Sequence, residues 1–274
     1  MTLHHHIPVE ADNAKKDHLW LHISSLPYFR GLLRAVEARF YENIELPSPT
    51  IDLGCGDGHF AALAFDRPLE VGLDPLGAPL REAVKRGRYL KVIEASGETI
   101  PYAASFFASA VSNSVLEHIP DLDPVMADLA RVLKPGAPFV FCVPNQNFLG
   151  ALSVSNFFDR IGLKFAANGY RRFFNRIARH YHCDAPEIWK ARLEKAGFEL
   201  VDWWHYFSPR ALRVLEWGHY FGLPSLITRK LFGKWILVPA RWNLIFTEWI
   251  TQKAYLEPSI QPEGTCTFYI VRRK

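Results

Sequence analysis

Cysteine is scarce in this 274-residue sequence, which contains four, and no two of them form a CxxC pair. Zinc sites and disulfide frameworks require ligands or partners at characteristic spacings, and this scatter provides neither. We therefore expect reduced thiols, as in a cytoplasmic protein. The four residues are Cys55, Cys142, Cys183 and Cys266.

Long apolar runs are also lacking. The longest stretch without a charged residue, 135–158, is interrupted by Pro138, Pro144 and three amide residues at 145–147. A membrane-spanning helix needs about 20 mostly apolar residues, so we expect a buried strand followed by a loop here. The N-terminus has no cationic segment followed by an apolar one, and no signal peptide is expected.

Charge of one sign is not in large excess, because 32 basic and 28 acidic residues leave a formal net charge of +4. The moderate basic excess, without a visible RNA-binding module, gives no reason to expect a nucleic-acid partner. Hydrophobic residues make up 49% of the chain and aromatic residues 14%, including eight tryptophans. This composition is ample for one sizeable globular core.

From Thr50 onward, short apolar runs alternate with helical ones. Strands are expected at 51–53, 69–73, 89–93, 107–111, 139–143, 198–207 and 266–271, and helices at about 58–66, 76–86, 121–133 and 184–195. Such alternation predicts an α/β fold with a parallel sheet and right-handed crossovers. The segments 147–184 and 208–264 do not fit the alternation, and we interpret them as helical, aromatic-rich capping insertions into one domain spanning 50–274.

A glycine-rich turn follows the first expected strand, where segment 52–58 has the sequence DLGCGDG. Glycines permit a tight turn and let a ligand lie against the backbone. Asp74, at the end of the second expected strand, is well placed to accept hydrogen bonds from both hydroxyls of a ribose. Ligands of open α/β sheets bind at this carboxyl edge.

Two nucleotide cofactors are compatible with such a turn. In the dinucleotide fingerprint GxGxxG the third glycine would stand where this chain has His59, and Asp52 and Asp57 would repel a pyrophosphate. S-adenosylmethionine (SAM) has no phosphate and carries a positive ammonium and a positive sulfonium. The acidic residues therefore favour SAM over NAD.

These residues and four later segments resemble the class I SAM-dependent methyltransferases of the small-molecule type-11 kind. The later segments are 94–102, 111–119, 132–136 and parts of 180–198. The resemblance covers about 50–146 and 178–207. It implies a Rossmann-like, seven-stranded sheet with helices on both faces, SAM as cofactor, and in-line transfer of a methyl group.

Carried over by position, the resemblance implies a cofactor-binding set. The turn from Asp52 would hold the methionine part, Asp74 the ribose, and Gly97 the edge of the adenine. Many relatives have Asp where this chain has Ser96, so adenine would meet a weaker acceptor. The full set is Asp52, Gly54, Cys55, Gly56, Gly58, Asp74, Pro75, Ser96, Gly97, Asn113 and Ser114.

Residues 1–49 precede the first strand. Pro27 can open a helix, and an apolar stripe beginning at Tyr28 and Phe29 follows it at helical spacing. Because the equivalent helix in relatives often closes over SAM, we interpret 1–49 as a helical lid. An ordinary packing face is the alternative, and residues 1–17 are polar and expected to be loose.

Histidines supply the candidate catalytic groups. His180 is the first candidate for a general base, because an uncharged imidazole accepts a proton near neutral pH, although a reaction without a base is an equal alternative. His118 is expected to form part of the acceptor pocket wall. His180 and His182 lie beside Cys183 and Asp184, but the spacing is not that of a metal site, and no metal is expected.

Together the two insertions carry a net positive charge larger than that of the whole chain. Segment 147–184 has six basic and two acidic residues, and segment 208–256 has seven basic and two acidic residues. The second insertion is also rich in aromatic residues. Helical spacing places five apolar residues on one helix face. They are Trp242, Ile245, Phe246, Trp249 and Ile250.

Three interpretations of the insertions remain open. The apolar face packs on the sheet or on a second subunit, or it contacts a membrane through 208–256 with the basic residues facing anionic lipid. Alternatively, the insertions enclose an aromatic pocket for an apolar or phosphate-bearing acceptor. The oligomeric state is left open, and the expected location is the cytoplasm, with the inner face of the membrane as the alternative.

The sequence thus predicts an enzyme that transfers a methyl group from SAM to a small-molecule or lipid-like acceptor, with oxygen as the expected site. An NAD-linked oxidoreductase and a non-catalytic SAM-binding protein are the alternatives. The base-directed methyltransferases of DNA and RNA often carry Asn/Asp-Pro-Pro-Tyr/Phe after the fourth strand. This chain has Asn113-Ser114-Val115-Leu116 there.

Overall fold

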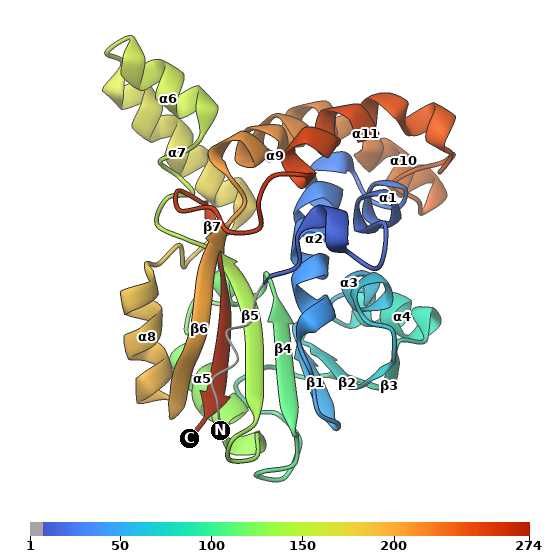
Figure 1. The fold of residues 1–274 in the computed structure, drawn as a ribbon, viewed down its shortest axis with the longest axis vertical. Helices are drawn as coiled ribbons and strands as arrows, with labels where there is room; N and C mark the ends of the chain where they lie inside the picture. Colours follow the sequence, from blue (N-terminus) through green and yellow to red (C-terminus); the bar gives the residue numbers. More distant parts are fainter. Residues whose placement is uncertain (1–7) are drawn as a thin grey trace.

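A computed structural model describes residues 8–274, and within them seven strands form one mixed sheet in the order β3-β2-β1-β4-β5-β7-β6 (Figure 1). The strands are β1 (Thr50–Leu53), β2 (Leu69–Asp74), β3 (Tyr89–Glu94), β4 (Ser109–Asn113), β5 (Pro138–Pro144), β6 (Phe198–Tyr206) and β7 (Cys266–Arg273). The expected seven-stranded α/β fold is confirmed. The parallel prediction is wrong for β7, which pairs antiparallel with both β5 and β6.

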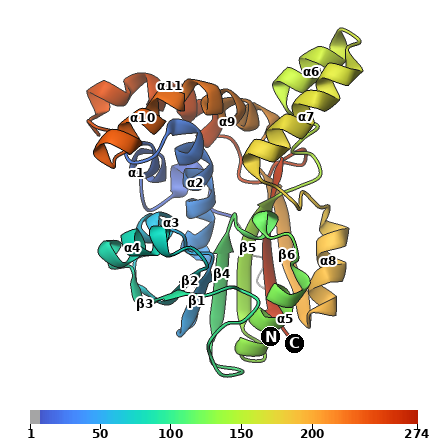
Figure 2. The same ribbon diagram turned by 180° about the vertical axis from the view of Figure 1, so that it is seen from behind.

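Helices cover both faces of the sheet (Figures 1 and 2). One face is covered by α2 (Tyr28–Phe40), α3 (His59–Ala64) and α4 (Gly77–Arg86), and the other by α5 (Asp123–Val132) and α8 (Pro186–Lys195). A hydrophobic core lies on each face of the sheet, and successive strand residues point into one core and then the other. Val140 of β5 packs on the α2 side, whereas Phe139 and Phe141 pack on the α5 side. Short 3-10 turns lie at Ala11–Asn13, Tyr41–Asn43 and Leu116–His118.

The N-terminal segment is held to the body of the protein more closely than its polarity predicts. Val9 is buried, and its carbonyl accepts a hydrogen bond of 2.8 Å from the Ser259 hydroxyl. The Glu10 carboxylate accepts the Ser259 backbone N–H. Helix α1 (His18–Ile23) begins at Asp17, whose side chain accepts the Trp20 N–H. The expectation of a loose segment is therefore wrong for 8–17, and residues 1–7 lie outside the described residues.

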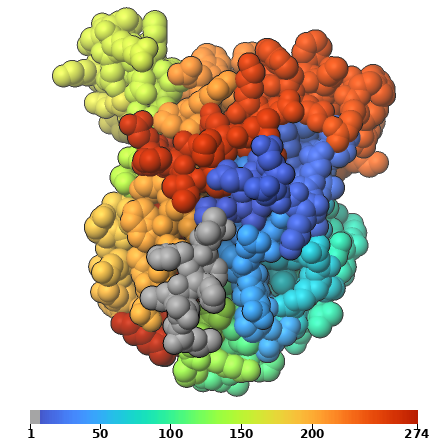
Figure 3. All heavy atoms as spheres, viewed as in Figure 1, coloured from blue at the N-terminus to red at the C-terminus, as the bar shows by residue number. Residues whose placement is uncertain are grey.

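Both insertions are helical, as expected, and they project from the same end of the molecule (Figures 1 and 3). The first forms an arm of two helices, α6 (Ser153–Arg160) and α7 (Lys164–Ala178). The second forms α9 (Pro209–Phe221), α10 (Leu223–Phe232) and α11 (Arg241–Tyr255), of which α9 and α11 pack against α2. Among residues 8–274, no helix combines the length and the apolar character that a bilayer span requires.

Candidate active site

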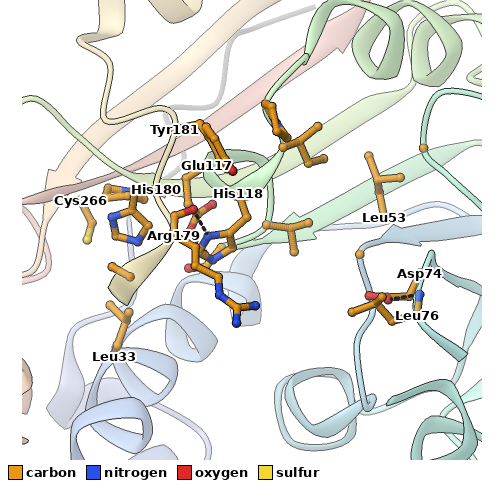
Figure 4. A pocket seen from close by; sticks show the side chains of 18 of the residues that line it. Leu33, Leu53, Asp74, Leu76, Glu117, His118, Arg179, His180, Tyr181 and Cys266 are labelled. Atoms are coloured by element: carbon orange, nitrogen blue, oxygen red, sulfur yellow. Dashed lines mark hydrogen bonds and ion pairs between the residues drawn. The ribbon is translucent and has the colours of Figure 1, made fainter. Parts of the chain in front are cut away.

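A cavity of about 910 Å³ opens at the carboxyl ends of the parallel strands. Strand ends and the loops after them supply its floor, for example at Leu53, Asp74 and Ser114, while α2, α7 and α9 supply its walls. Figure 4 shows two groups of polar side chains on opposite sides of this space, Asp74 on one side and Glu117, His118 and His180 on the other. Open α/β sheets bind ligands at this edge.

The glycine turn is shaped by residues in left-handed backbone conformations. Gly54, Gly56 and Gly58 have φ angles of 78°, 54° and 69°, which residues with side chains rarely adopt. A Cβ atom at Gly54 would also lie 2.3 Å from the Val115 side chain, so this position has no room for another residue. The turn therefore brings bare backbone to the edge of the cavity at Gly54, which lines it.

Asp74 lines the cavity at the end of β2 and is held by two backbone groups. One carboxylate oxygen accepts the Gly56 N–H at 3.0 Å, and the other accepts the Leu76 N–H at 2.9 Å. Each oxygen keeps acceptor capacity, because a carboxylate offers about four lone-pair sites. The fixed carboxylate can therefore accept further hydrogen bonds from a pair of hydroxyls.

Asp52 lies beneath the turn and is not among the residues that line the cavity. Its carboxylate accepts a 2.5 Å hydrogen bond from the Tyr89 hydroxyl. Burial raises the pKa of Asp52 to about 7, and the charge of nearby Asp74 adds to the shift. The hydrogen bond joins Asp52 of β1 to Tyr89 of β3, and a direct contact of Asp52 with the methionine part of SAM stays a prediction.

The other predicted cofactor residues divide into two groups. Gly54, Asp74, Pro75, Ser96, Gly97 and Ser114 line the cavity. The lining does not include Cys55, Gly56, Gly58 or Asn113. Gly56 and Gly58 shape the turn, whereas Asn113 donates to the Glu37 carboxylate at 2.7 Å. Their roles in cofactor binding stay predictions.

Helix α2 contributes charged residues that the sequence analysis missed. Arg30 and Arg34 line the cavity together with Phe29 and Leu33 of the same helix. Burial opposes the charge of Arg34, but Glu37, whose carboxylate lies 2.8 Å away, holds the pKa of Arg34 above its ordinary value. The sequence could have indicated these residues, because Arg30, Arg34 and Glu37 recur at i, i+4 and i+7 and so share one helix face beside the apolar stripe.

Glu37 joins α2 to the sheet at the edge of the cavity. Its fully buried carboxylate accepts hydrogen bonds from Arg34, Asn113, Ser114 and Tyr206, at 2.7–2.9 Å. Since Asn113 ends β4 and Tyr206 ends β6, one side chain connects one helix with two strands. A buried charge needs such a complete set of partners. The network fixes the helix wall of the cavity relative to its floor.

Both candidate catalytic histidines line the cavity, with ring centroids 5.3 Å apart. The Nδ1 atom of His118 lies 3.0 Å from the Arg179 carbonyl oxygen, which can only accept, so Nδ1 carries the proton. The Nε2 atom of the neutral ring is therefore the proton acceptor, and it lies 3.8 Å from a carboxyl oxygen of Glu117. Burial lowers the pKa of His118 as well. Burial lowers the pKa of His180 to about 3, so His180 is a weak base.

Glu117 is buried beside these histidines, and its Oε2 atom has no hydrogen-bond partner. Burial raises the pKa of Glu117 to about 8. One atom each from Glu117, His118 and His180 lie within 4.8 Å of one another, a grouping that could ligate a cation. From the sequence no metal is expected at these residues, and that stays a prediction.

The two insertions contribute unequally to the cavity: the first supplies three of its four aromatic side chains, Phe148, Phe174 and Tyr181, and the second supplies none. Of their basic residues only Arg179 lines it, and the cavity-lining residues of the second insertion are Leu215 and His219. The aromatic residues of 208–256 are not among the lining residues, so an aromatic pocket formed by that insertion is not what the structure shows. The cavity takes its aromatic side chains from Phe29, Phe148, Phe174 and Tyr181.

Comparisons with known proteins agree with this geometry. A family model described as a methyltransferase domain matches residues 26–203, more than half of the chain. A SAM-dependent methyltransferase of Thermotoga maritima has a similar structure, with a TM-score of 0.52 and 15% identity over 93% of this chain and 91% of that one. The chain belongs to the methyltransferase family, with the class I fold and SAM as the cofactor of its class.

Curated relatives match shorter segments. An uncharacterized methyltransferase of Mycobacterium sp. (strain JLS) is 34% identical over 90 residues, which are 31% of this chain and 34% of the relative. The ubiquinone biosynthesis O-methyltransferase of Vibrio atlanticus (strain LGP32) is 30% identical over 107 residues, 36% of this chain and 44% of the relative. The chain thus spans less than half the length of these relatives.

Proposed function

We propose that the protein transfers the methyl group of SAM to an oxygen atom of a small-molecule or lipid-like acceptor. The observation that carries this proposal is one cavity with two different ends, a carboxylate end at Asp74 and a histidine end at His118 and His180 (Figure 4). The O-methyltransferase of ubiquinone biosynthesis among the relatives supports oxygen as the atom methylated.

The residues at the carboxylate end fit SAM. The free acceptor capacity of Asp74 suits the two ribose hydroxyls, and we assign the adenine edge to Ser96 and Gly97, which line the same cavity. The methionine part of SAM carries an ammonium and a carboxylate. We assign the carboxylate to Arg34, because a guanidinium recognises carboxylates well and this one already faces the cavity. In this arrangement α2 serves as the predicted lid and also packs in the core.

The histidine end suits an apolar acceptor bearing a hydroxyl group. Six apolar side chains surround this part of the cavity, namely Phe29, Leu33, Phe148, Phe174, Ile177 and Leu215. Burial of such side chains against a ligand stabilises the complex by about 25 cal/mol per Å² of apolar surface removed from water. A hydrocarbon body would bind here, and its hydroxyl would point to the histidines.

SAM supplies an electrophilic methyl carbon on its sulfonium, and the chain positions the two reactants and accepts one proton. The acceptor oxygen forms a bond to the methyl carbon as the carbon–sulfur bond breaks, which leaves S-adenosylhomocysteine. We assign the released proton to Nε2 of His118, because that atom is unprotonated in the neutral ring, whereas burial lowers the pKa of His180 to about 3 and makes that ring a poor base. His180 then positions the acceptor.

Methyl-labelled SAM, supplied with separate aqueous, lipid and RNA extracts, tests the proposal. We expect label in the lipid or the aqueous fraction, and label found only in RNA would contradict the acceptor class. Binding of S-adenosylhomocysteine without any labelled product would favour the non-catalytic alternative. With an active extract, His118→Gln should lower kcat about 100-fold or more, the contribution of general base catalysis, and His180→Gln should mainly raise KM.

A further inference from the structure

We propose that the α6–α7 arm and the α10–α11 unit together dock on an anionic lipid bilayer and that the cavity receives its acceptor from that bilayer. The second part rests on the proposed function. Two surfaces carry the inference. The arm tip is defined as residues 160–165, and the C-terminal helical unit as residues 223–255.

The arm tip exposes apolar side chains where a hairpin turns. All six of its residues are exposed to solvent. Phe165 is 86% exposed, and Ile161 and Leu163 are each more than half exposed. Arg160 and Lys164 alternate with them. Apolar residues bracketed by cations at a protruding tip suit insertion between lipid headgroups, where apolar side chains reach hydrocarbon and cations meet phosphate.

The C-terminal helical unit exposes an even larger apolar surface. Helix α10 has no buried residue, and Ile227, Leu231 and Phe232 are all exposed. On α11, Trp242 and Phe246 are 75% and 77% exposed. The apolar face predicted from the sequence is therefore real, and its packing on this chain's own sheet is excluded by that exposure. Large apolar side chains exposed on two successive helices indicate an interaction site.

Charge around these surfaces selects the partner. The acidic residues nearby are already paired, Asp159 with Arg171 and Glu248 with Arg241. Lys164, Lys230 and Lys234 are exposed, and none of them forms an ion pair within residues 8–274. Basic residues close to an anionic membrane are attracted to its surface.

A second copy of the chain fits the same surfaces poorly. A two-fold interface brings one surface against the same surface of the other copy. One insertion has six basic and two acidic residues and the other has seven basic and two acidic residues, so positive charge would face positive charge. An anionic bilayer is instead complementary to both insertions. It can also contact two separate projections at once, because the arm and the C-terminal helical unit rise from the same end of the molecule (Figure 1).

The arm also connects the bilayer side with the cavity. Phe165, Phe173 and Ile177 are exposed apolar residues spaced along α7, and Ile177 lines the cavity. Phe174, on the same helix, is buried and lines the cavity as well. An apolar acceptor that leaves a bilayer at the arm tip would thus follow apolar side chains as far as the histidine end.

Flotation with vesicles of phosphatidylcholine, alone or mixed with phosphatidylglycerol, tests the docking of the full chain. We expect the protein to float with the anionic vesicles and to be released by high salt. Leu163→Ser/Phe165→Ser and Trp242→Ser/Phe246→Ser should each weaken vesicle binding about tenfold or more, because each removes large apolar side chains from the contact. The matched control is Leu90→Ser on β3, since Leu90 is 74% exposed and remote from both insertions.

Calorimetry with S-adenosylhomocysteine separates this inference from the proposed function. The docking variants should keep the cofactor affinity of the wild type and lose label transfer to lipid extract. If lipid is never labelled although the protein floats, the acceptor assignment fails and the docking stands. The docking proposal fails if the wild type does not bind anionic vesicles. It also fails if Leu90→Ser weakens vesicle binding as much as the two docking variants do. It also fails if Trp242→Ser/Phe246→Ser converts a stable dimer into a monomer in sedimentation equilibrium.

Discussion

At the scale of single residues, Asp74 both shapes the site and faces the ligand. Its carboxylate accepts the N–H groups of Gly56 and Leu76 and still borders the cavity. We expect Asp74→Asn to weaken the binding of S-adenosylhomocysteine about 10- to 100-fold, because a hydrogen bond to a charged group contributes roughly 1.5–3 kcal/mol. Calorimetry measures the loss. Asp123→Asn, at an exposed ion pair with Lys195, is the control and should bind as the wild type does.

The buried carboxyl group of Glu117 makes stability depend on pH. Its pKa is raised by burial to about 8, so the folded protein binds this proton more tightly than the unfolded chain. The stabilising contribution of this bound proton is therefore complete at pH values below the pKa that Glu117 has in the unfolded chain. It declines as the pH rises towards 8. Glu117→Gln keeps a neutral side chain of similar shape and removes this titration.

Urea unfolding at pH 5, 7 and 9 measures the effect of Glu117. We expect the wild type to lose a few kcal/mol of unfolding free energy relative to Glu117→Gln between pH 5 and 9, since each pKa unit corresponds to about 1.4 kcal/mol. Parallel curves for the two proteins would show that Glu117 is not protonated in the folded state.

At the scale of elements, α2 is the part of the wall most firmly connected to the sheet. The four donors to Glu37 come from α2 itself, from β4 and the loop after it, and from β6. Replacing one member of a buried ion pair leaves a charge unpaired and costs about 3–5 kcal/mol. Glu37→Gln should therefore lower the unfolding free energy by about that amount and weaken the cofactor complex through Arg34.

Chemical denaturation measures the stability of Glu37→Gln, and Glu82→Gln provides the comparison. Glu82 forms an i,i+3 pair with Lys85 on the exposed side of α4, where solvent screens such pairs and they contribute little to stability. Equal losses for both variants would contradict the role of Glu37 as the connection between helix and strands.

At the scale of the whole molecule, cofactor binding should stabilise the fold, because strands, loops and α2 all border one cavity. At 100 times its dissociation constant, S-adenosylhomocysteine should add about 2.7 kcal/mol, which corresponds to a rise in Tm of roughly 5–10 °C. NADH should leave the Tm unchanged. Thermal unfolding with each ligand measures this difference, and stabilisation by NADH alone would support the dinucleotide alternative.

The two insertions show why local patterns predict an element and not its surroundings. Helical spacing correctly placed Trp242 and Phe246 on one face of a helix, since periodicity is a local property. Whether that face packs on the sheet or meets solvent depends on where the connections carry the helix. The fold carries α11 onto α2 through its other face, where Leu244, Thr251 and Ala254 are buried, and leaves the aromatic face outward.

The sequence by itself determined the class of protein, because the glycine turn and Asp74 are local motifs whose chemistry depends on residues adjacent in the chain. Only the tertiary structure decided that Arg34 borders the cavity and is held by Glu37, that the Tyr89 hydroxyl binds Asp52, and that His118 and His180 lie side by side. These relations join residues 60 or more positions apart or depend on burial. The packing of helices on the sheet decides which distant residues meet and which side chains are buried. No short segment of sequence encodes that packing.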